Sequence, residues 1–451
     1  MPKKFHFSFI LSLLNLARKH PLAMFNQLNT ENWRTLTRAV MNEPPQQILN
    51  NIVNLLRSTS AQSDNNIELE TKKFVQGIIT TKRKAIICIS HEATRTGAPA
   101  IIHKIGEYIN NEIDYFPIYI LCKNGDLSTL FLETSYTYTI KNNKIKKYLQ
   151  LEINTLIKHL KDRFTISAVL FNSEGSTHLL KYFSNNKVNN RISLIHEMGS
   201  YYPIGSWKHI NKLSDKILFP ANEIKRLALL NTKFDLSKID VKGQGLLKKE
   251  LLFIDKNNSK EKLCKSLNIS SKSIIILGCG LLDARKGIDI FTSIAIQSIR
   301  RTSVPLHFIW LGRADKNETQ IWVERDIKAA KLESQIHFLG LKKNVAPYFT
   351  GSDLFLLTSR GDPYPCVVHE ALASGLPVIA FKDSGGTEEI ITEDIGIITP
   401  YADTMDVINN VVRLSENEDR LSRMSDSART FAQKELDFSI YYKSIKKYWK
   451  N

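Results

Sequence analysis

The sequence has few cysteines, and no two of them are spaced for metal or redox chemistry. Five occur among 451 residues, at Cys88, Cys122, Cys264, Cys279 and Cys366. The lack of a CxxC pair argues against a zinc ribbon or a disulfide framework. A reducing cytoplasm is therefore the simplest setting for the chain.

The sequence also lacks an apolar run that could cross a bilayer. The stretch "MPKKFHFSFILSLLNLARKHPLAMF" places an apolar run after two lysines, but the run soon reaches Arg18 and Lys19, and no small-residue cleavage site follows. A bilayer core of about 30 Å needs a longer run. We expect residues 1–25 to form an amphipathic helix that either packs on the next domain or lies on an anionic membrane surface. Residues 1–70 are predicted to be a helical accessory segment.

Two further absences narrow the function. Gly278 and Gly280 are not followed by the third glycine of a dinucleotide fingerprint, which disfavours binding of NAD. No basic motif interleaved with aromatic residues, such as an RNA-recognition signature, is present, so we expect no nucleic-acid partner. The formal net charge of +17 nevertheless favours an anionic partner such as phosphate or a lipid head group.

The chain carries an alternation of strand and helix patterns over most of its length. Short, nearly all-apolar runs such as "KAIICIS", "ISAVLFN", "SIIILGCG" and "PVIAF" are typical of buried parallel strands. They fall into two groups, which predicts an α/β protein with two Rossmann-like, doubly wound domains at residues 80–250 and 255–435. The final stretch, 436–451, has aromatic residues on one helical face, and we expect it to pack back on the first domain. Ligands of such sheets bind at the carboxyl ends of the strands, so two facing sheets would enclose a cleft.

Two loops at predicted strand ends carry candidate site residues. After "SIIILGCG", Arg285 and Lys286 precede a helix, and a helix start with an adjacent lysine suits an oxyanion or a phosphate. In "TSRGDPYPCVVHEALASGLPVIAF", Asp362 lies in a loop and Glu370 on the helix that follows. Carboxylates form charge-assisted hydrogen bonds with sugar hydroxyls. A diphosphate between two helix starts, with carboxylates at the sugars, describes a nucleotide sugar.

The second loop resembles the hallmark of the retaining GT-B glycosyltransferases called family 4. That hallmark is an acidic residue, seven residues and a glutamate, followed by a helix and a "G-x-PVIA" strand, and the chain continues it with "GGTEEII" at 385–391. The resemblance is specific over 270–400 and weaker over 84–245, where "SHEATRTGAP" and "LIHE" are similar to family loops. Residues 1–70 do not match the shared fold. The resemblance implies a GT-B fold with an N-terminal helical extension.

The resemblance also implies a role for each matching position. Lys286 corresponds to a lysine on the donor diphosphate, Glu370 to a glutamate on the donor ribose, and Asp362 to the acidic residue that faces the transferred sugar. His196 matches a histidine near that sugar. Further donor-binding positions are the amides of Cys366 and Val367, the loop glycine Gly97 and, less closely matched, Arg285. Apart from the resemblance, Gly312 follows the predicted strand "LHFIWL" and is a candidate for lining the nucleotide pocket.

This chain departs from the family pattern at three points. The first acidic residue is more often glutamate than aspartate, and Pro365 removes one amide from the phosphate loop. An arginine that the family often places after the first strand of the second domain is replaced by Gly280 or Leu281, and Arg285 is the candidate substitute.

Each candidate also has a purely structural interpretation. Lys286 could be a solvated charge, Glu370 a first-turn glutamate that favours the helix dipole, and Asp362 a turn former before Pro363. His196 could be a hydrogen-bonded core histidine. His91 could fill the cleft, and Gly312 with Arg313 could form a tight turn.

The implied reaction is transfer of a sugar from a nucleotide donor to a hydroxyl, with retention of anomeric configuration and without a metal or other cofactor. The expected partners are a nucleotide sugar, a glycan or lipid-linked acceptor and, as an alternative role for the N-terminal helix, an anionic membrane surface. By analogy with the family, we expect a role in bacterial surface-polysaccharide assembly. The protein would then be cytoplasmic, with peripheral attachment to the inner face of the plasma membrane as an option. A GT-B epimerase or sugar phosphorylase, or a non-catalytic anion-binding protein, are the competing hypotheses.

Overall fold

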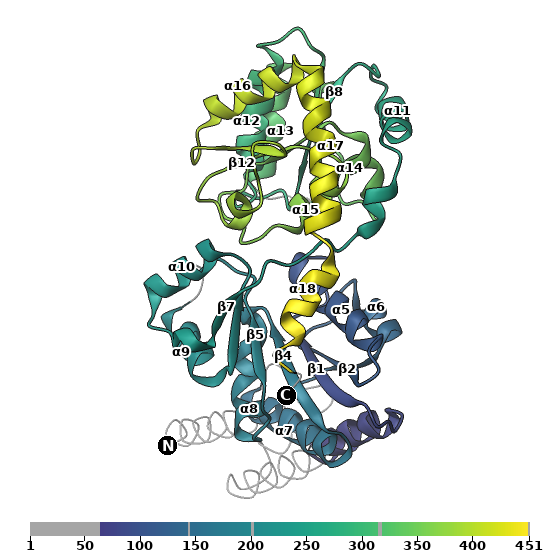
Figure 1. Ribbon diagram of the computed structural model, residues 1–451, viewed down its shortest axis with the longest axis vertical. Helices are drawn as coiled ribbons and strands as arrows, with labels where there is room; N and C mark the ends of the chain where they lie inside the picture. Colours follow the sequence, from purple (N-terminus) through teal and green to yellow (C-terminus); the bar gives the residue numbers. More distant parts are fainter. Residues whose placement is uncertain (1–63, 143–144, 200–202, 314–317, 450–451) are drawn as a thin grey trace, which may run out of the picture.

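The computed structural model describes residues 64–142, 145–199, 203–313 and 318–449. Two α/β domains are stacked one above the other, each built on its own parallel sheet (Figure 1). The expected amphipathic helix at 1–25 and most of the accessory segment at 1–70 lie outside the described residues. The described end of that segment, 64–70, is the start of a helix that runs to residue 77, and after it Val75 and Ile78 pack in the core of the first domain.

The first domain is built on a seven-stranded sheet with the order β3-β2-β1-β4-β5-β6-β7. Every neighbouring pair is parallel, as fully apolar strands predict. Its strands are β1 (Lys84–Ser90), β2 (Tyr115–Leu121), β3 (Tyr136–Thr139), β4 (Ile166–Asn172), β5 (Arg191–Leu194), β6 (Lys216–Phe219) and β7 (Ile239–Val241).

Helices cover both faces of this sheet and bury its alternating side chains. Ile87 and Ile89 face a core closed by α7–α10, whereas Ile86 and Cys88 face a second core closed by α5 and α6. The helices are α5 (Gly97–Asn110), α6 (Ser128–Thr134), α7 (Lys146–Arg163), α8 (Leu180–Asn185), α9 (Ile204–Leu213) and α10 (Asn222–Asn231). Short 3-10 turns occupy η1 (Glu174–Leu179) and η3 (Leu236–Lys238).

The second domain repeats this arrangement around six parallel strands in the order β10-β9-β8-β11-β12-β13. The strands are β8 (Ile274–Cys279), β9 (Leu306–Leu311), β10 (Ile336–Phe338), β11 (Leu354–Leu357), β12 (Val378–Phe381) and β13 (Gly396–Thr399). The helices are α11 (Lys256–Leu267), α12 (Ile288–Ile299), α13 (Glu318–Ala330), α14 (Ala346–Gly351), α15 (Cys366–Ala373), α16 (Thr404–Ser415) and α17 (Glu418–Glu435), with 3-10 turns η4 (Lys249–Phe253) and η5 (Gly386–Glu389). One face packs on α11, α14, α15 and α17, and the other on α12, α13 and α16.

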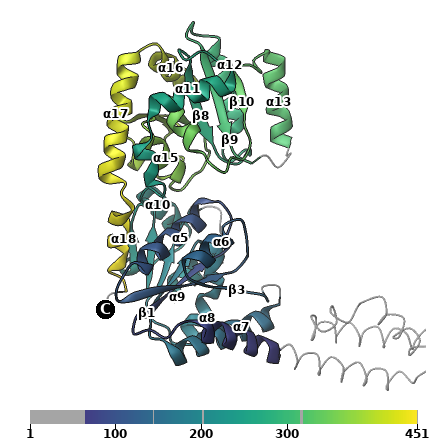
Figure 2. The same ribbon diagram turned by 90° about the vertical axis from the view of Figure 1, so that its right-hand side faces the viewer.

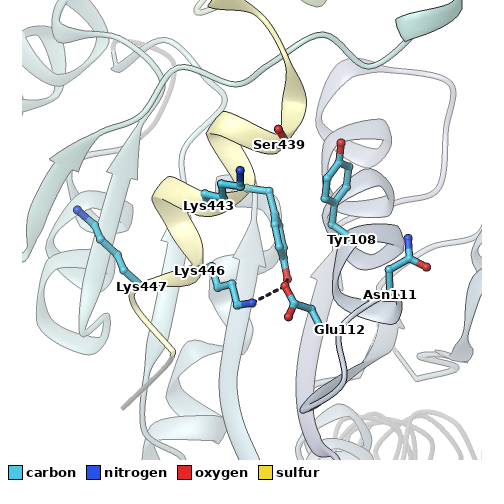
Figure 3. Close-up of a pocket in the computed structure, with 8 residues that line it drawn as sticks. Tyr108, Asn111, Glu112, Ser439, Lys443, Lys446 and Lys447 are labelled. Atoms are coloured by element: carbon cyan, nitrogen blue, oxygen red, sulfur yellow. Dashed lines mark hydrogen bonds and ion pairs between the residues drawn. The ribbon is translucent and has the colours of Figure 1, made fainter.

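The last helix, α18 (Phe438–Lys446), returns to the first domain. In Figures 1 and 2, α17 runs along the second domain and α18 continues onto the first. The aromatic face of α18 joins the core that contains β1 and β2, and Trp449 behind it is fully buried. Just after α5, Glu112 accepts a hydrogen bond from Tyr442 and pairs with Lys446 (Figure 3). These three residues and the exposed Lys443 and Lys447 line a pocket between α5 and α18.

The two chain segments that connect the domains lie side by side. Leu246 lies in the segment that leads to the second domain, and its amide donates to the carbonyl of Leu436, in the segment that returns to the first domain, at 2.6 Å. Lys249 pairs with Asp437 at 3.1 Å. Within the described ranges, no helix combines the length and apolarity needed to cross a membrane.

Candidate functional site

The candidate site lies where loops at the carboxyl ends of the two sheets meet. Gly97 is the first residue of α5 in the first domain, and Cys366 is the first residue of α15 in the second. A Cβ atom placed on Gly97 would lie 3.4 Å from Cys366 Sγ. The starts of these two helices therefore approach each other, and both present the positive end of a helix dipole to the same place.

Lys286 and Asp362 form an ion pair across two loops of the second domain. Nζ of Lys286 donates to Oδ2 of Asp362, and the two side chains are only 14% and 10% exposed. Ser359 Oγ also donates to this carboxylate oxygen at 3.3 Å. Because both side chains are largely buried, Lys286 is not a solvated surface charge, and Asp362 does more than form a turn before Pro363.

The loop that carries Asp362 is held in place by main-chain contacts. The amide of Asp362 donates to the carbonyl of Ser384 at 2.7 Å, and Arg285 donates from Nη1 to the carbonyl of Gly361 at 3.2 Å. The guanidinium of Arg285 thus contacts the loop itself. Its predicted contact with a donor remains a prediction.

Two glycines in this region allow backbone segments to approach closely. A Cβ on Gly312 would lie 1.7 Å from the carbonyl oxygen of Gly280, and one on Gly287 would lie 2.0 Å from that of Thr358. Gly287 has a φ of +71°, which favours glycine. Gly312 therefore has a packing reason to be glycine, and its contact with the nucleotide stays a prediction.

Glu370 lies one turn into α15 and has a partner that the sequence did not suggest. Its carboxylate is 9% exposed, and Oε1 is 2.9 Å from Nζ of Lys248 on the linker between the domains. Burial raises the pKa of Glu370, while the charge and hydrogen bond of Lys248 lower it. Nothing in the sequence pattern relates a linker lysine to a glutamate more than a hundred positions later.

The first turn of α15 provides the amides expected for an anion. Pro365 is the N-cap residue and accepts from the amide of Val368 at 3.0 Å. The amides of Cys366 and Val367 precede the first intrahelical bond, as first-turn amides do. Burial, with further contributions from Glu370 and Asp362, raises the pKa of the Cys366 thiol to about 12, so this thiol is neutral.

On the opposite side, His196 is held as a neutral imidazole. Asn172 Nδ2 donates to the carbonyl of Ala98 at 2.8 Å, which turns its Oδ1 toward His196 Nε2, also at 2.8 Å. Nε2 must therefore carry the proton. Burial, reinforced by the neighbouring His91, lowers the pKa of His196 to about 3. Its Nδ1 is buried and has no hydrogen-bond partner among the described residues.

Glu197, beside His196, is a third carboxylate of interest that was not predicted from the sequence. Ser173, which adopts a φ of +75°, donates to Glu197 Oε1, and the amides of Glu174 and His196 donate to Oε2 at 3.2 and 3.1 Å. Burial raises the pKa of Glu197 against these hydrogen bonds. The only sequence signal was its place beside His196 in "LIHE". The neighbouring His91 has its Nε2 atom 3.6 Å from Oε1 of Glu92, and its side chain packs beside Gly175.

Contacts between the domains hold the loop of Asp362 against the first domain. Glu389 in the "GGTEEII" segment accepts from Asn222 at 2.9 Å and from the amide of Glu223 at 3.0 Å. Gln244 donates to the carbonyl of Tyr364 at 2.8 Å. The acidic loop of the second domain thus touches the first domain directly. In the described part of the chain, no three His, Cys, Asp or Glu side chains gather as a metal ligand set would.

Known proteins are similar in sequence to this chain, and a family model matches its second domain. Residues 273–417 match the family model Glycosyl transferases group 1. An uncharacterized glycosyltransferase of Haemophilus influenzae is 24% identical over 307 residues, which cover 66% of this chain and 76% of the relative. A UDP-Gal:alpha-D-GlcNAc-diphosphoundecaprenol alpha-1,3-galactosyltransferase of Escherichia coli is 25% identical over 48% of this chain and 55% of its own length.

Solved structures agree with this architecture. The structure of Anabaena Alr3699/HepE in complex with UDP-glucose superposes with a TM-score of 0.70 at 15% identity and covers 80% of this chain and 98% of that one. The prediction of a GT-B fold with two Rossmann-like domains is confirmed. Together with the family match and the relatives, it identifies the chain as a glycosyltransferase with the GT-B fold.

Proposed function

We propose that this enzyme is a retaining glycosyltransferase of family 4 that moves a sugar from a nucleoside-diphosphate sugar to a hydroxyl of a glycan or lipid-linked acceptor. The observation that carries the proposal is the grouping of Lys286, Asp362 and Glu370 around the start of α15. One cation, two carboxylates and a set of helix-start amides match the parts of such a donor: a diphosphate, a ribose and a sugar.

In this proposal, Glu370 accepts a hydrogen bond from a ribose hydroxyl and the amides of Cys366 and Val367 hold the diphosphate. Lys286 exchanges its contact with Asp362 for the diphosphate as the donor enters. When the glycosidic bond breaks, negative charge accumulates on the leaving diphosphate. A lysine and amides that are already oriented stabilise that charge more in the transition state than in the bound donor.

In the same proposal, Asp362 and His196 contact the transferred sugar. Asp362 can accept hydrogen bonds from sugar hydroxyls once Lys286 has turned to the diphosphate. His196, with its proton on Nε2, offers the lone pair of Nδ1 and can only accept a hydrogen bond there. The leaving diphosphate takes the proton of the acceptor hydroxyl on the same face of the sugar, so no cofactor and no protein-bound metal are needed.

The acceptor class is supported by the relatives. The Escherichia coli enzyme named above and a Campylobacter jejuni N-acetylgalactosaminyltransferase, which is 25% identical over 55% of this chain, both carry a diphospho-undecaprenol acceptor in their names. An Escherichia coli O-antigen biosynthesis glycosyltransferase is also similar. A role in surface-polysaccharide assembly at the cytoplasmic face of the membrane accounts for these likenesses and for the charge of +17.

The test is a transfer assay with a panel of UDP-, GDP-, ADP- and dTDP-sugars and polyprenyl-diphosphate-linked sugar acceptors. Mass spectrometry should detect one added sugar with one donor, and NMR should show the donor's anomeric configuration in the product. An inverted product would refute retention. Conversion of the donor without an acceptor into an epimer, or phosphorolysis of a glycan, would point instead to an epimerase or a phosphorylase.

A further inference from the structure

Lys248 contacts the glutamate that we assign to the donor ribose, and it lies outside every motif of the second domain. It belongs to the linker, where it is the N-cap residue of η4. We infer that Lys248 is a positioning residue that holds the carboxylate of Glu370 in place for the nucleotide. This inference rests on the proposed function of Glu370 as the ribose contact.

The geometry divides the two carboxylate oxygens of Glu370 between two tasks. Lys248 Nζ lies 2.9 Å from Oε1, and among the described residues no other side chain is hydrogen-bonded to the carboxylate. Oε2 is therefore available to accept from a hydroxyl group. Because the side chain of Glu370 is buried and its carboxylate is planar, holding Oε1 sets the rotation about the Cγ–Cδ bond and therefore the direction of Oε2.

The charges around Glu370 show why one lysine matters. Glu250 on η4 adds a like charge near the carboxylate. Three further titratable groups lie around it: the buried His369 and the partly exposed Cys366 on α15, and the partly exposed Cys279 on β8. Burial raises the pKa of both cysteine thiols and lowers the pKa of His369 to about 4, so all three groups are neutral near pH 7. Lys248 is the cation in contact with Glu370, and it opposes the effect of burial on the pKa of this carboxylate.

The position of Lys248 is set by the crossing between the domains. The amide of Leu246 is hydrogen-bonded to the carbonyl of Leu436, so the main chain just before Lys248 is bound to the returning chain. The neighbouring Lys249, 66% exposed, pairs with Asp437 only at the surface, where an ion pair contributes little. Lys248 contacts α15 from the linker between the domains, whereas Lys286 contacts Asp362 from the loop after β8 of the second domain. Each acidic residue of the motif is thus paired with a lysine from a different structural element.

The test is calorimetric titration with UDP, or with GDP, ADP or dTDP if one of these binds the wild type more tightly, between pH 5 and 8. The variants are Lys248→Met, the conservative Lys248→Arg, Glu370→Gln and the double variant. Lys249→Met is the control, because this neighbouring lysine pairs with Asp437 instead. Thermal unfolding shows whether each variant is folded.

We expect Lys248→Met to weaken nucleotide binding about tenfold at pH 7 and to move the acid-side loss of affinity toward neutral pH, because Glu370 then takes up a proton more readily. Lys248→Arg should restore most of the affinity, and Lys249→Met should resemble the wild type. In the Glu370→Gln background, Lys248→Met should have little further effect.

Two outcomes separate this inference from the proposed function. If Glu370→Gln weakens binding and Lys248→Met leaves both affinity and pH profile unchanged, the role of Lys248 is refuted and the donor site stands. If the wild type binds no nucleoside diphosphate, or Glu370→Gln binds as the wild type does, the proposed function itself fails.

Discussion

Lys286 and Asp362, 76 positions apart, are brought together as a largely buried ion pair between two loops of the second domain. A buried pair of this kind makes each partner costly to remove singly, because the remaining charge is left without its counter-ion. In the proposed function, the donor replaces this contact when it binds. The ion pair would then contribute to stability in the free enzyme, and its lysine to catalysis in the bound one.

Substitution of Lys286 by methionine should therefore reduce transfer by about 100-fold or more, because the leaving diphosphate loses a charge-assisted contact. It should also lower the free energy of unfolding, since Asp362 remains charged and buried. Initial rates with saturating acceptor and urea unfolding curves measure the two effects. Lys272→Met, at an exposed lysine before β8, is the matched control.

The double variant Lys286→Met/Asp362→Asn separates the two roles. Removing both charges should recover much of the lost stability, whereas transfer should remain as low as in the single variant. Recovery of transfer in the double variant would mean that Lys286 serves only to neutralise Asp362.

A different readout addresses Glu370. If its carboxylate accepts from a ribose hydroxyl, the wild type should bind UDP at least tenfold more tightly than 2′,3′-dideoxy-UDP, and Glu370→Gln should lose most of that preference. Competition binding with both nucleotides measures it. An unchanged preference in Glu370→Gln would place the ribose contact elsewhere.

Gly287 positions Lys286 through the backbone. Alanine at this position would put a Cβ 2.0 Å from the carbonyl oxygen of Thr358 at a φ of +71°, so we expect destabilisation of about 2 kcal/mol or more. Gly205→Ala in α9, where a Cβ meets nothing within 4 Å, should be neutral or slightly stabilising. Equal unfolding midpoints for the two variants would contradict this account of Gly287.

His196 should give the protein a defined dependence on pH. Its pKa is about 3 in the folded state and about 6.5 when unfolded, so the unfolded chain binds the extra proton. Stability is therefore lost as the pH falls from about 6.5 toward 3, by up to about 1.4 kcal/mol per pH unit. Urea unfolding of the wild type and His196→Gln at pH 7.5, 6 and 5 should show a shallower decline in the variant; parallel curves would show that His196 is not kept neutral by folding.

Much of the fold follows from the sequence because the central strands are strongly apolar. The runs at β1 and β4 match the predicted stretches residue for residue, and α15 begins where the proline-bracketed loop ends. The prediction did not include β3, β7 and β13. All three lie at sheet edges and are only three or four residues long, so they have too few buried positions to produce a pattern.

The candidate site was predictable to the extent that its residues share a local motif. Asp362, Cys366 and Glu370 lie within nine residues, and a helix start relates them directly. Lys248 and Glu197 could not be found in this way, because their partners come from other elements: Lys248 contacts Glu370 on α15, and Glu197 accepts from Ser173 after β4. The same holds for Glu389, whose contacts with α10 exist only in the folded pair of domains.

The measurement that tests the donor site most directly is the unfolding temperature of the wild type and of Glu370→Gln across a panel of nucleotide sugars. A ligand at 100 times its dissociation constant adds about 2.7 kcal/mol to the stability of the protein that binds it. We predict a rise for one class of donor in the wild type and a much smaller rise for the same donor in the variant. No rise with any nucleotide sugar, or an equal rise in both proteins, would contradict the account.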